Sequence, residues 1–118
     1  MDIEKFREYC LSLPSVTEDF PFDETVLVFR VKNKIFACVC LDKPELGVLK
    51  CDPEYAVELR DHYMAIEPAW HWNKKYWNQI WFNRDVDDKL IYDLAAHSYS
   101  EVVKKLPKKD QIDLKNTK

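Results

Sequence analysis

Two apolar runs separated by three residues constrain the fold of this chain more than any other feature. Val26–Val31 and Ile35–Leu41 are rich in β-branched and aromatic residues, a composition typical of β-strands. Between them stands Lys32-Asn33-Lys34, and asparagine tolerates the left-handed backbone that a tight hairpin turn requires. Both runs are apolar on both faces for most of their length. The pattern therefore predicts an antiparallel hairpin that is central in a sheet and covered.

Shorter signals predict the elements on either side of this hairpin. Apolar residues at helical spacing indicate a helix over residues 2–13, and residues 15–24 form a polar, acidic connection. After the hairpin, a turn at Lys43-Pro44 leads into a third strand over residues 46–51, in which Gly47 marks a bulge.

The second half of the chain begins with a clear helix start. Asp52-Pro53 combines an N-cap residue with a proline at the first helical position, and this helix is expected to end near His62. Residues 64–76 have no regular period and are predicted to be irregular. Trp77–Phe82 reads as the last strand.

The C-terminal region is predicted to be helical from near Asp87. Ser98-Tyr99-Ser100-Glu101 matches a capping box, which predicts a break into two helices at this point. The lysine-rich tail 108–118 is low in apolar residues and is expected to be frayed and flexible. Residues 1–107 therefore predict one α+β domain, an antiparallel sheet covered on one face by N- and C-terminal helices.

Glycine and charge exclude several functions. Gly47 is the single glycine of the chain, so neither a P-loop nor a dinucleotide-binding fingerprint can be present. The net charge of −3 is polarised along the sequence, so local fields rather than net charge would steer a partner. The acids of residues 1–24 are Asp2, Glu4, Glu8, Glu18, Asp19, Asp23 and Glu24, and the lysines of residues 102–118 are Lys104, Lys105, Lys108, Lys109, Lys115 and Lys118.

The N-terminal residues and the cysteines indicate the compartment. The start Met-Asp-Ile-Glu lacks the basic and apolar regions of a signal peptide, and the longest apolar run is too short to span a bilayer. We therefore expect a cytoplasmic protein without a membrane partner, in which the cysteines are free thiols. Cys38 and Cys40 would share one face of a strand, but without a second ligand pair they favour buried thiols over zinc. No metal and no cofactor is predicted.

All four tryptophans fall within the twelve residues from Trp70 to Trp81. These rings can fill the core of a small domain, and Trp77 in particular is expected to lie in the core between helical layers. They can also form a surface for a nucleic acid or for a protein partner, because tryptophan is enriched in both kinds of interface. The cluster identifies the segment in which a function should be sought.

Several short motifs, in order, resemble one family. They are Leu13-Pro14 at the end of the first helix, Lys34-Ile35-Phe36-Ala37, Leu49 to Glu54, His71-Trp72-Asn73-Lys74 followed by Trp77, and Ser98-Tyr99. Together they span residues 1–107 and resemble the MmcQ/YjbR-like proteins, small bacterial domains with a frataxin-like (CyaY-like) α+β fold. The family often has a second histidine before Trp77, where this chain has Tyr76.

The resemblance implies a non-enzymatic protein that binds double-stranded DNA through a double wing of hairpin loops. In this chain the wings would be the hairpin tip and the segment after Trp72, since lysines and amides at loop tips reach phosphates and groove edges. Binding is expected to be weak and independent of sequence. The predicted site residues are Lys32, Asn33, Lys34, Trp72, Asn73, Lys74, Lys75 and Arg84.

Two other functions remain open on the sequence. The tryptophan-rich surface could bind a protein partner or a second copy of the chain. In frataxin-like proteins acids on the first helix bind iron loosely, and the acidic N-terminal residues occupy comparable positions, although a shared fold is a poor warrant for function. His62, His71 and His97 are widely spaced and match no catalytic signature, so His71 is expected to make a structural hydrogen bond that holds the irregular segment.

Overall fold

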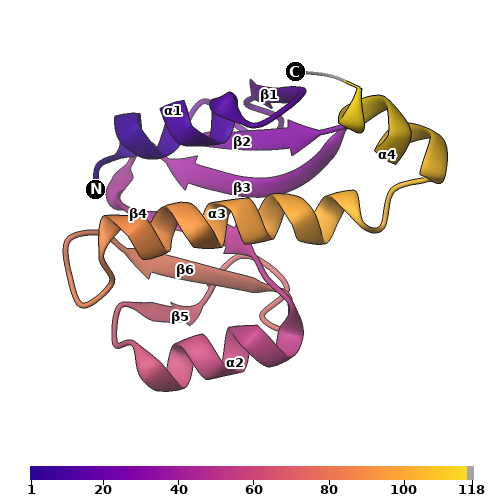
Figure 1. Ribbon diagram of the computed structural model, residues 1–118. Helices are drawn as coiled ribbons and strands as arrows, with labels where there is room; N and C mark the ends of the chain where they lie inside the picture. The colour runs from indigo at the N-terminus through magenta and orange to yellow at the C-terminus, as the bar shows by residue number, and fades with distance from the viewer. Residues whose placement is uncertain (117–118) are drawn as a thin grey trace.

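The central hairpin forms as the sequence predicts. In the computed structural model, which describes residues 1–116, β2 (Val26–Val31) and β3 (Lys34–Cys40) pair antiparallel through a two-residue turn. Lys32 and Asn33 have φ angles of 48° and 69°, the left-handed pair typical of a type I′ turn. The hairpin lies within a six-stranded antiparallel sheet of order β1-β2-β3-β4-β6-β5 (Figure 1).

Both edges of the sheet are short strands in segments that the sequence analysis described as irregular. β1 (Val16–Asp19) pairs with β2, and β5 (Ile66–Pro68) pairs with β6 (Trp77–Trp81). The predictions for these segments were therefore wrong at these residues. An edge strand of three or four residues with polar side chains is formed by its neighbour rather than by its own composition.

The third long strand also begins earlier than predicted. β4 (Lys43–Lys50) includes Pro44, which had been assigned to a turn. The register between β3 and β4 shifts after the Val39–Gly47 pair, and Lys43 then pairs with Cys40. Gly47 thus borders the irregularity, and the bulge accommodates a proline inside the strand.

Three aspartates cap the helices α1 (Ile3–Ser12), α2 (Pro53–His62) and α3 (Asp88–Val103). Asp2, Asp52 and Asp87 each accept a hydrogen bond from the backbone NH three residues later, which satisfies a donor at the helix start. Figure 1 shows α3 lying across the sheet with α1 and α2 on either side of it. No helix within residues 1–116 is long and apolar enough to cross a membrane.

The C-terminal region differs from its prediction in two places. α3 is continuous, because Ser98 is buried and donates its hydroxyl hydrogen bond to the Lys50 carbonyl instead of capping a new helix. The tail was expected to be frayed, but its residues form α4 (Lys108–Lys115), which buries Leu114 and pairs Asp113 with Lys32 of the hairpin turn. The last two residues of the tail, 117–118, lie outside the described residues.

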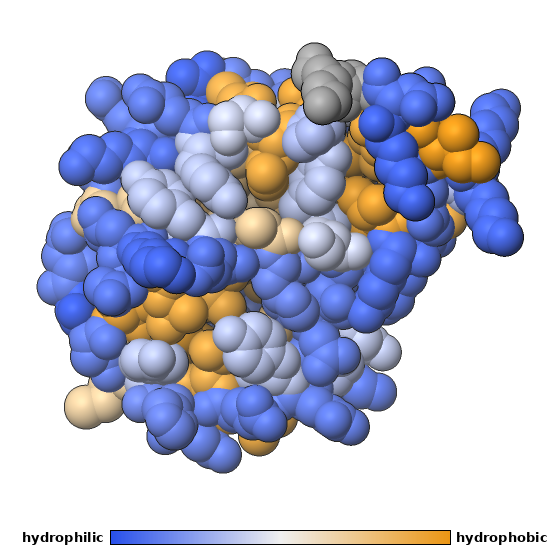
Figure 2. Space-filling view, in the orientation of Figure 1, coloured by the Kyte–Doolittle hydropathy of each residue, from blue (hydrophilic) through white to orange (hydrophobic). Residues whose placement is uncertain are grey.

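The sheet has two unlike faces. All four helices contribute to the apolar cluster on one side, the helix face, where Phe6, Phe29 and Phe36 are among the largest fully buried side chains. Figure 2 shows this side of the molecule, mostly charged and polar with apolar side chains in the seams beside α3. The opposite side, the open face, has a smaller cluster that includes Val28 and Val48 and is covered by the segment 69–77.

Candidate functional site

The residues from Trp70 to Trp81, which we call the tryptophan segment, lie on the open face. Side chains alternate along β6, so Trp77 and Trp81 pack on the open face while Ile80 packs on the helix face. Trp77 is 8% exposed and stacks on Trp72, with ring centroids 4.4 Å apart and tilted by 35°. Trp77 is therefore a core residue, as predicted, but it lies beneath a loop and not between helical layers.

Hydrogen bonds from buried polar side chains hold this segment in place. Glu67 Oε1 accepts from Gln79 Nε2 at 2.6 Å and from Trp81 Nε1 at 2.8 Å, and Gln79 Oε1 accepts the backbone NH of Trp70 at 3.3 Å. Arg60 of α2 donates to Asn78 and to the carbonyl of Lys74. The tryptophan segment is thus fixed to both of its neighbours, the sheet and α2.

His71 does not have the structural role that the sequence analysis gave it. Its ring is exposed, and the turn is instead held by Asn73, whose side chain accepts the NH of Lys75 and whose carbonyl accepts the NH of Tyr76. The asparagine is the better acceptor for this purpose because its short side chain reaches the backbone two residues later.

An open groove of about 700 Å³ lies on the open face beside this segment. We call it the aromatic groove: its walls are Phe22, Trp70 and Trp72, and its floor includes Val26, Cys38 and Val48. Phe22 is 65% exposed and Trp70 46% exposed, although large apolar side chains are usually buried. The edge of Phe22 contacts Trp72, with ring centroids 6.3 Å apart. The volume lies within the range of about 300–1,000 Å³ of ligand pockets.

Lysines from four segments meet at the end of the sheet beside the hairpin turn. We call this cluster the basic end: Lys34, Lys50, Lys75 and Lys105, with the neighbouring rings of Tyr76 and Trp77. The ammonium groups of Lys75 and Lys105 lie 5.4 and 5.5 Å from the centroid of Tyr76, and that of Lys50 lies 5.9 Å from Trp77. Antiparallel pairing places the start of β3, the end of β4 and the start of β6 at this same end, on the right of Figure 1.

The pKa of Lys50 reflects its burial and the nearby charges of Lys105 and Lys34. Burial is the main cause that lowers the pKa of Lys50, and the positive charges of Lys105 and Lys34 lower it further, while Glu101 opposes them. The ion pairs of lysines within residues 1–116 involve Lys32, Lys89 and Lys104. The four lysines of the basic end are thus available to an anionic ligand.

The structure brings together some of the predicted site residues and separates others. Lys34 and Lys75 belong to the basic end, and Trp72 links it to the aromatic groove through Trp77. Arg84 lies beyond the other end of β6, with its guanidinium 4.5 Å from the Trp81 centroid.

The remaining four predicted residues serve the structure of the loops. Lys32 pairs with Asp113 of α4, and Lys74 donates to the Trp70 carbonyl. Asn33 forms the turn and accepts a hydrogen bond from Arg30 on its carbonyl, and Asn73 holds the segment around Lys75. Their side chains or backbones are engaged within the fold.

Sequence reasoning missed Lys50 and Lys105. Lys50 was read as a residue of the third strand and Lys105 as one lysine among many near the C-terminus. The only signal for Lys50 was its position at the end of a strand, which is informative once the register with β6 is known.

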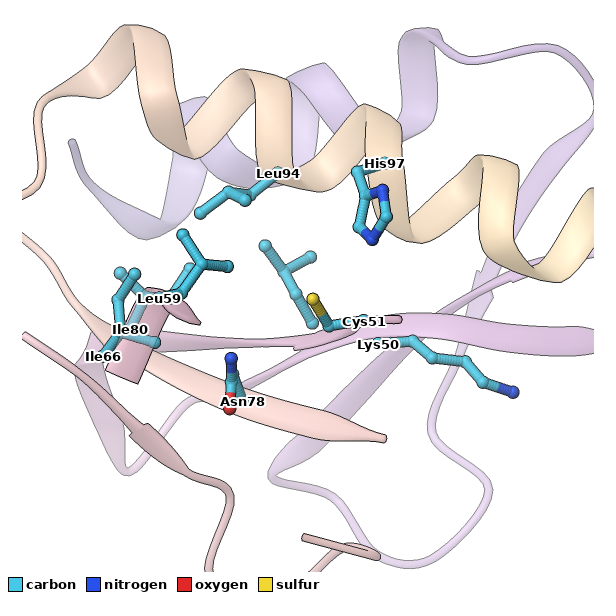
Figure 3. A pocket seen from close by; sticks show the side chains of 9 residues that line it. Lys50, Cys51, Leu59, Ile66, Asn78, Ile80, Leu94 and His97 are labelled. Atoms are coloured by element: carbon cyan, nitrogen blue, oxygen red, sulfur yellow. The ribbon is translucent and has the colours of Figure 1, made fainter. Parts of the chain in front are cut away.

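A second, much smaller pocket lies beneath α3 and is too small for a ligand. Its volume of about 10 Å³ would hold at most one water molecule. In Figure 3 His97 extends from α3 toward Cys51, and the Lys50 side chain points away from the cavity. His97 Nε2 accepts the backbone NH of Asp52 at 3.2 Å, so this histidine is the one that makes a structural hydrogen bond.

The cysteines are free thiols, as predicted, and three of them are buried. Burial raises the pKa of Cys38 and of Cys51 to about 12, so both remain protonated at neutral pH. Cys40 is half-buried and lines the aromatic groove beside Cys38.

Several acidic residues of the N-terminal segment form ion pairs with arginines or accept hydrogen bonds from nearby residues. Glu18 pairs with Arg7 at 2.5 Å and Asp19 with Arg30 at 2.8 Å. Asp23 Oδ1 accepts hydrogen bonds from Thr25 and Val26. Within residues 1–116 no three histidine, cysteine or acidic side chains are grouped so as to hold a metal ion.

Comparison with known proteins identifies the family. The model of the YjbR family matches residues 11–101, which include the whole sheet, the aromatic groove and three of the four lysines of the basic end. The chain belongs to the YjbR family. Two Escherichia coli relatives are named as uncharacterized proteins. YbdF of strain O157:H7 is 33% identical over 92% of this chain and 89% of the relative, and YjbR of strain K12 is 29% identical over 91% and 92%.

Solved structures show the same fold. A Deinococcus radiodurans protein with a DUF419 domain superposes with a TM-score of 0.87 and 35% identity, over 95% of this chain and 86% of that one. A Pseudomonas syringae protein gives a TM-score of 0.73 at 24% identity, over 86% of this chain and 98% of that one, which supports the fold alone. The α+β architecture implied by the sequence is therefore confirmed.

Proposed function

We propose that this YjbR-family protein binds the phosphate backbone of DNA through its basic end, as a binding protein and not as an enzyme. The observation that carries the proposal is the convergence of four lysines: Lys75 and Lys105 lie over the ring of Tyr76, Lys50 lies over Trp77, and the charges of Lys34 and Lys105 act on Lys50. Lysine side chains that neutralise phosphates supply most of the affinity of non-specific DNA binding. The wing residues Lys34 and Lys75 retain their predicted role, and Lys50 and Lys105 replace the lysines engaged within the fold.

The charge distribution explains why such binding would be weak. The protein carries a net charge of −3, so its overall field opposes an approach to DNA while the basic end attracts it locally. Four phosphate contacts without base contacts correspond to a dissociation constant in the micromolar range or weaker at physiological salt. The cytoplasm is the proposed location, because four free thiols suit a reducing compartment that also contains DNA.

Fluorescence anisotropy with a labelled DNA duplex at several salt concentrations tests this proposal. If four lysines contact phosphates, the logarithm of the association constant should fall with the logarithm of salt at a slope near −4. Replacing Lys75 and Lys105 by glutamine should reduce the magnitude of the slope by about two.

The matched control is the pair Lys108→Gln and Lys109→Gln, because both lysines are exposed on α4 and lie outside the basic end. This pair removes the same charge and should leave the slope unchanged. Equal losses in the two double variants would show that the charge of the whole molecule, and not the basic end, determines binding.

A further inference from the structure

We infer that the aromatic groove binds an unpaired nucleobase of a strand whose phosphates lie on the basic end. This inference rests on the proposed function for the backbone contacts, but the groove makes its own prediction. A base inside a duplex is stacked on both sides, so only a single-stranded or extruded base can enter a groove between aromatic side chains. The inferred ligand is therefore single-stranded nucleic acid.

The walls of the groove provide stacking surfaces that the fold does not itself use fully. Phe22 and Trp70 are 65% and 46% exposed, and both line a groove whose other lining residues include Val26, Cys38 and Val48. Aromatic side chains bind single-stranded nucleic acid by stacking on its bases, with little preference for sequence. Exposed rings that line one groove offer a planar ligand faces on which it can stack.

The charged groups that line the groove disfavour a phosphate there and can hydrogen-bond to the edge of a base. Asp23 and Asp42 line it and would repel a phosphate. Lys43, whose ammonium group lies 5.5 Å from the centroid of Trp70, adds a donor. Together these groups offer acceptors and a donor, which suit the N–H groups and carbonyls at the edge of a base. Phosphate and base are thus assigned to different parts of the open face.

Asp23 is prepared for the acceptor role by its own hydrogen bonds. The three that it accepts within residues 1–116, from the NH and hydroxyl of Thr25 and the NH of Val26, all end on Oδ1. They lower the pKa of this carboxyl below its usual range, so it is ionised at neutral pH, and Oδ2 remains to accept from a ligand. Guanine, whose edge carries N–H donors, can donate one of them to Oδ2.

The groove and the basic end are connected through stacked rings. Phe22 contacts Trp72, Trp72 stacks on Trp77, and the ammonium group of Lys50 lies 5.9 Å from the Trp77 ring. A strand with one base in the groove can therefore continue along Trp72 to the lysines around Tyr76 without leaving the open face.

The first experiment compares labelled 12-nucleotide probes by fluorescence anisotropy: a guanine-containing single strand, its duplex, and an abasic strand with the same backbone. We expect the single strand to bind at least about tenfold more tightly than the other two. Trp70→Ala should remove most of this difference, whereas Met64→Ala, which alters another exposed apolar side chain outside the groove, should leave it intact. Equal binding of the single strand and the abasic strand would overturn the inference.

The second experiment separates the groove from the basic end by using guanosine, which has no phosphate. Guanosine should shift the indole Nε1–H signals of Trp70 and Trp72 in NMR spectra, in the wild type and equally in the Lys75→Gln, Lys105→Gln variant. Unshifted signals at millimolar guanosine, or a shift caused by dimerisation through the groove, would refute the base site. The proposed function fails separately, if the lysine variant leaves the salt dependence of duplex binding unchanged.

Discussion

The two faces of the sheet differ in what covers them. On the helix face four helices cover the strands, and the central rings such as Phe36 are fully buried. On the open face one segment of about nine residues covers part of the strands and leaves a groove of about 700 Å³ with exposed aromatic walls. The same strands supply both faces, because successive side chains of a strand point in opposite directions.

The side chains that stabilise the fold and those that could contact a ligand therefore lie on different faces. A side chain that is buried among helices contributes to stability through the apolar surface that it removes from water. An exposed ring such as Phe22 contributes little to stability in this way. Exposed apolar surface of this kind marks a site that binds a ligand or a partner. The helix face therefore accounts for the fold, and the open face is where the candidate site lies.

The largest expected effect is on the helix face. Phe36→Ala should lower the free energy of unfolding by about 3–5 kcal/mol, because the ring is fully buried and contacts Tyr99 edge-on at 5.6 Å between centroids. Phe22→Ala, the same substitution on the open face, should change it by less than about 0.5 kcal/mol. Urea denaturation of both variants measures the difference. Comparable losses would mean that the groove wall is part of the core.

Glu67→Ala should have the next largest effect and is the strongest test of the open face. It removes the acceptor shared by Gln79 and Trp81 and leaves a buried amide donor unsatisfied, at a cost of about 1–3 kcal/mol. Glu67→Gln keeps an acceptor oxygen and should cost less. If the two variants were equally stable by urea denaturation, the hydrogen bonds would not hold the tryptophan segment.

Gly47→Ala tests how tightly the helix face is packed. A Cβ at this position would lie 3.0 Å from Phe6 Cε1 and 3.1 Å from Phe82 Cζ, so overpacking should destabilise the protein by about 1–3 kcal/mol. Adding Phe6→Leu should make the combined loss smaller than the sum of the two single losses, since the added methyl group gains space. Strict additivity in thermal or urea unfolding would contradict this contact.

The smallest expected effects concern pH. Asp85 accepts the NH groups of Met64 and Ala65 beside α2, and Asp23 accepts those of Thr25 and Val26 beside the groove. These bonds lower the pKa of both carboxyls below the usual 3.8, so each stabilises the fold above that pH. The contribution is lost as the pH falls through the lowered value.

Urea denaturation at pH 7 and near pH 3 distinguishes the two aspartates. Asp85→Asn should weaken the acid dependence of stability more than Asp23→Asn does, because Asp85 holds the junction of α2 and β5 on the helix face. An equal or larger effect of Asp23→Asn would assign structural importance to the groove wall.

Most of the fold could be predicted from the sequence, because the patterns that indicate its strands, turns and helix caps each involve neighbouring residues. The hairpin, the capped helix after Asp52, the final long strand and the overall α+β plan each depend on residues adjacent in sequence. The failures share a physical cause. β1 and β5 form because a neighbouring strand offers them hydrogen bonds, and Ser98 does not cap a helix because its hydroxyl finds the Lys50 carbonyl.

The candidate site was predictable only in part. The concentration of tryptophan pointed to the segment beside which the candidate site lies, and Lys34 and Lys75, which the sequence analysis singled out, belong to the basic end. Their proximity to Lys50 and Lys105 could not be read from the chain, because it depends on strand register and on where α3 ends. The exposed wall formed by Phe22 also went unnoticed, because its segment shows no periodic pattern.

The sequence by itself determined the long central strands and the capped helices, that the cysteines are free, and that glycine-based phosphate loops are absent from the chain. These properties depend on backbone preferences and on residue identity, which act over a few neighbouring positions. The sequence also implied that helices cover one face of the sheet, but only the tertiary structure decided that lysines and aromatic rings from distant segments meet at one end of it. Such meetings depend on pairing between strands, whose register is set by the burial of the whole sheet and not by any one segment.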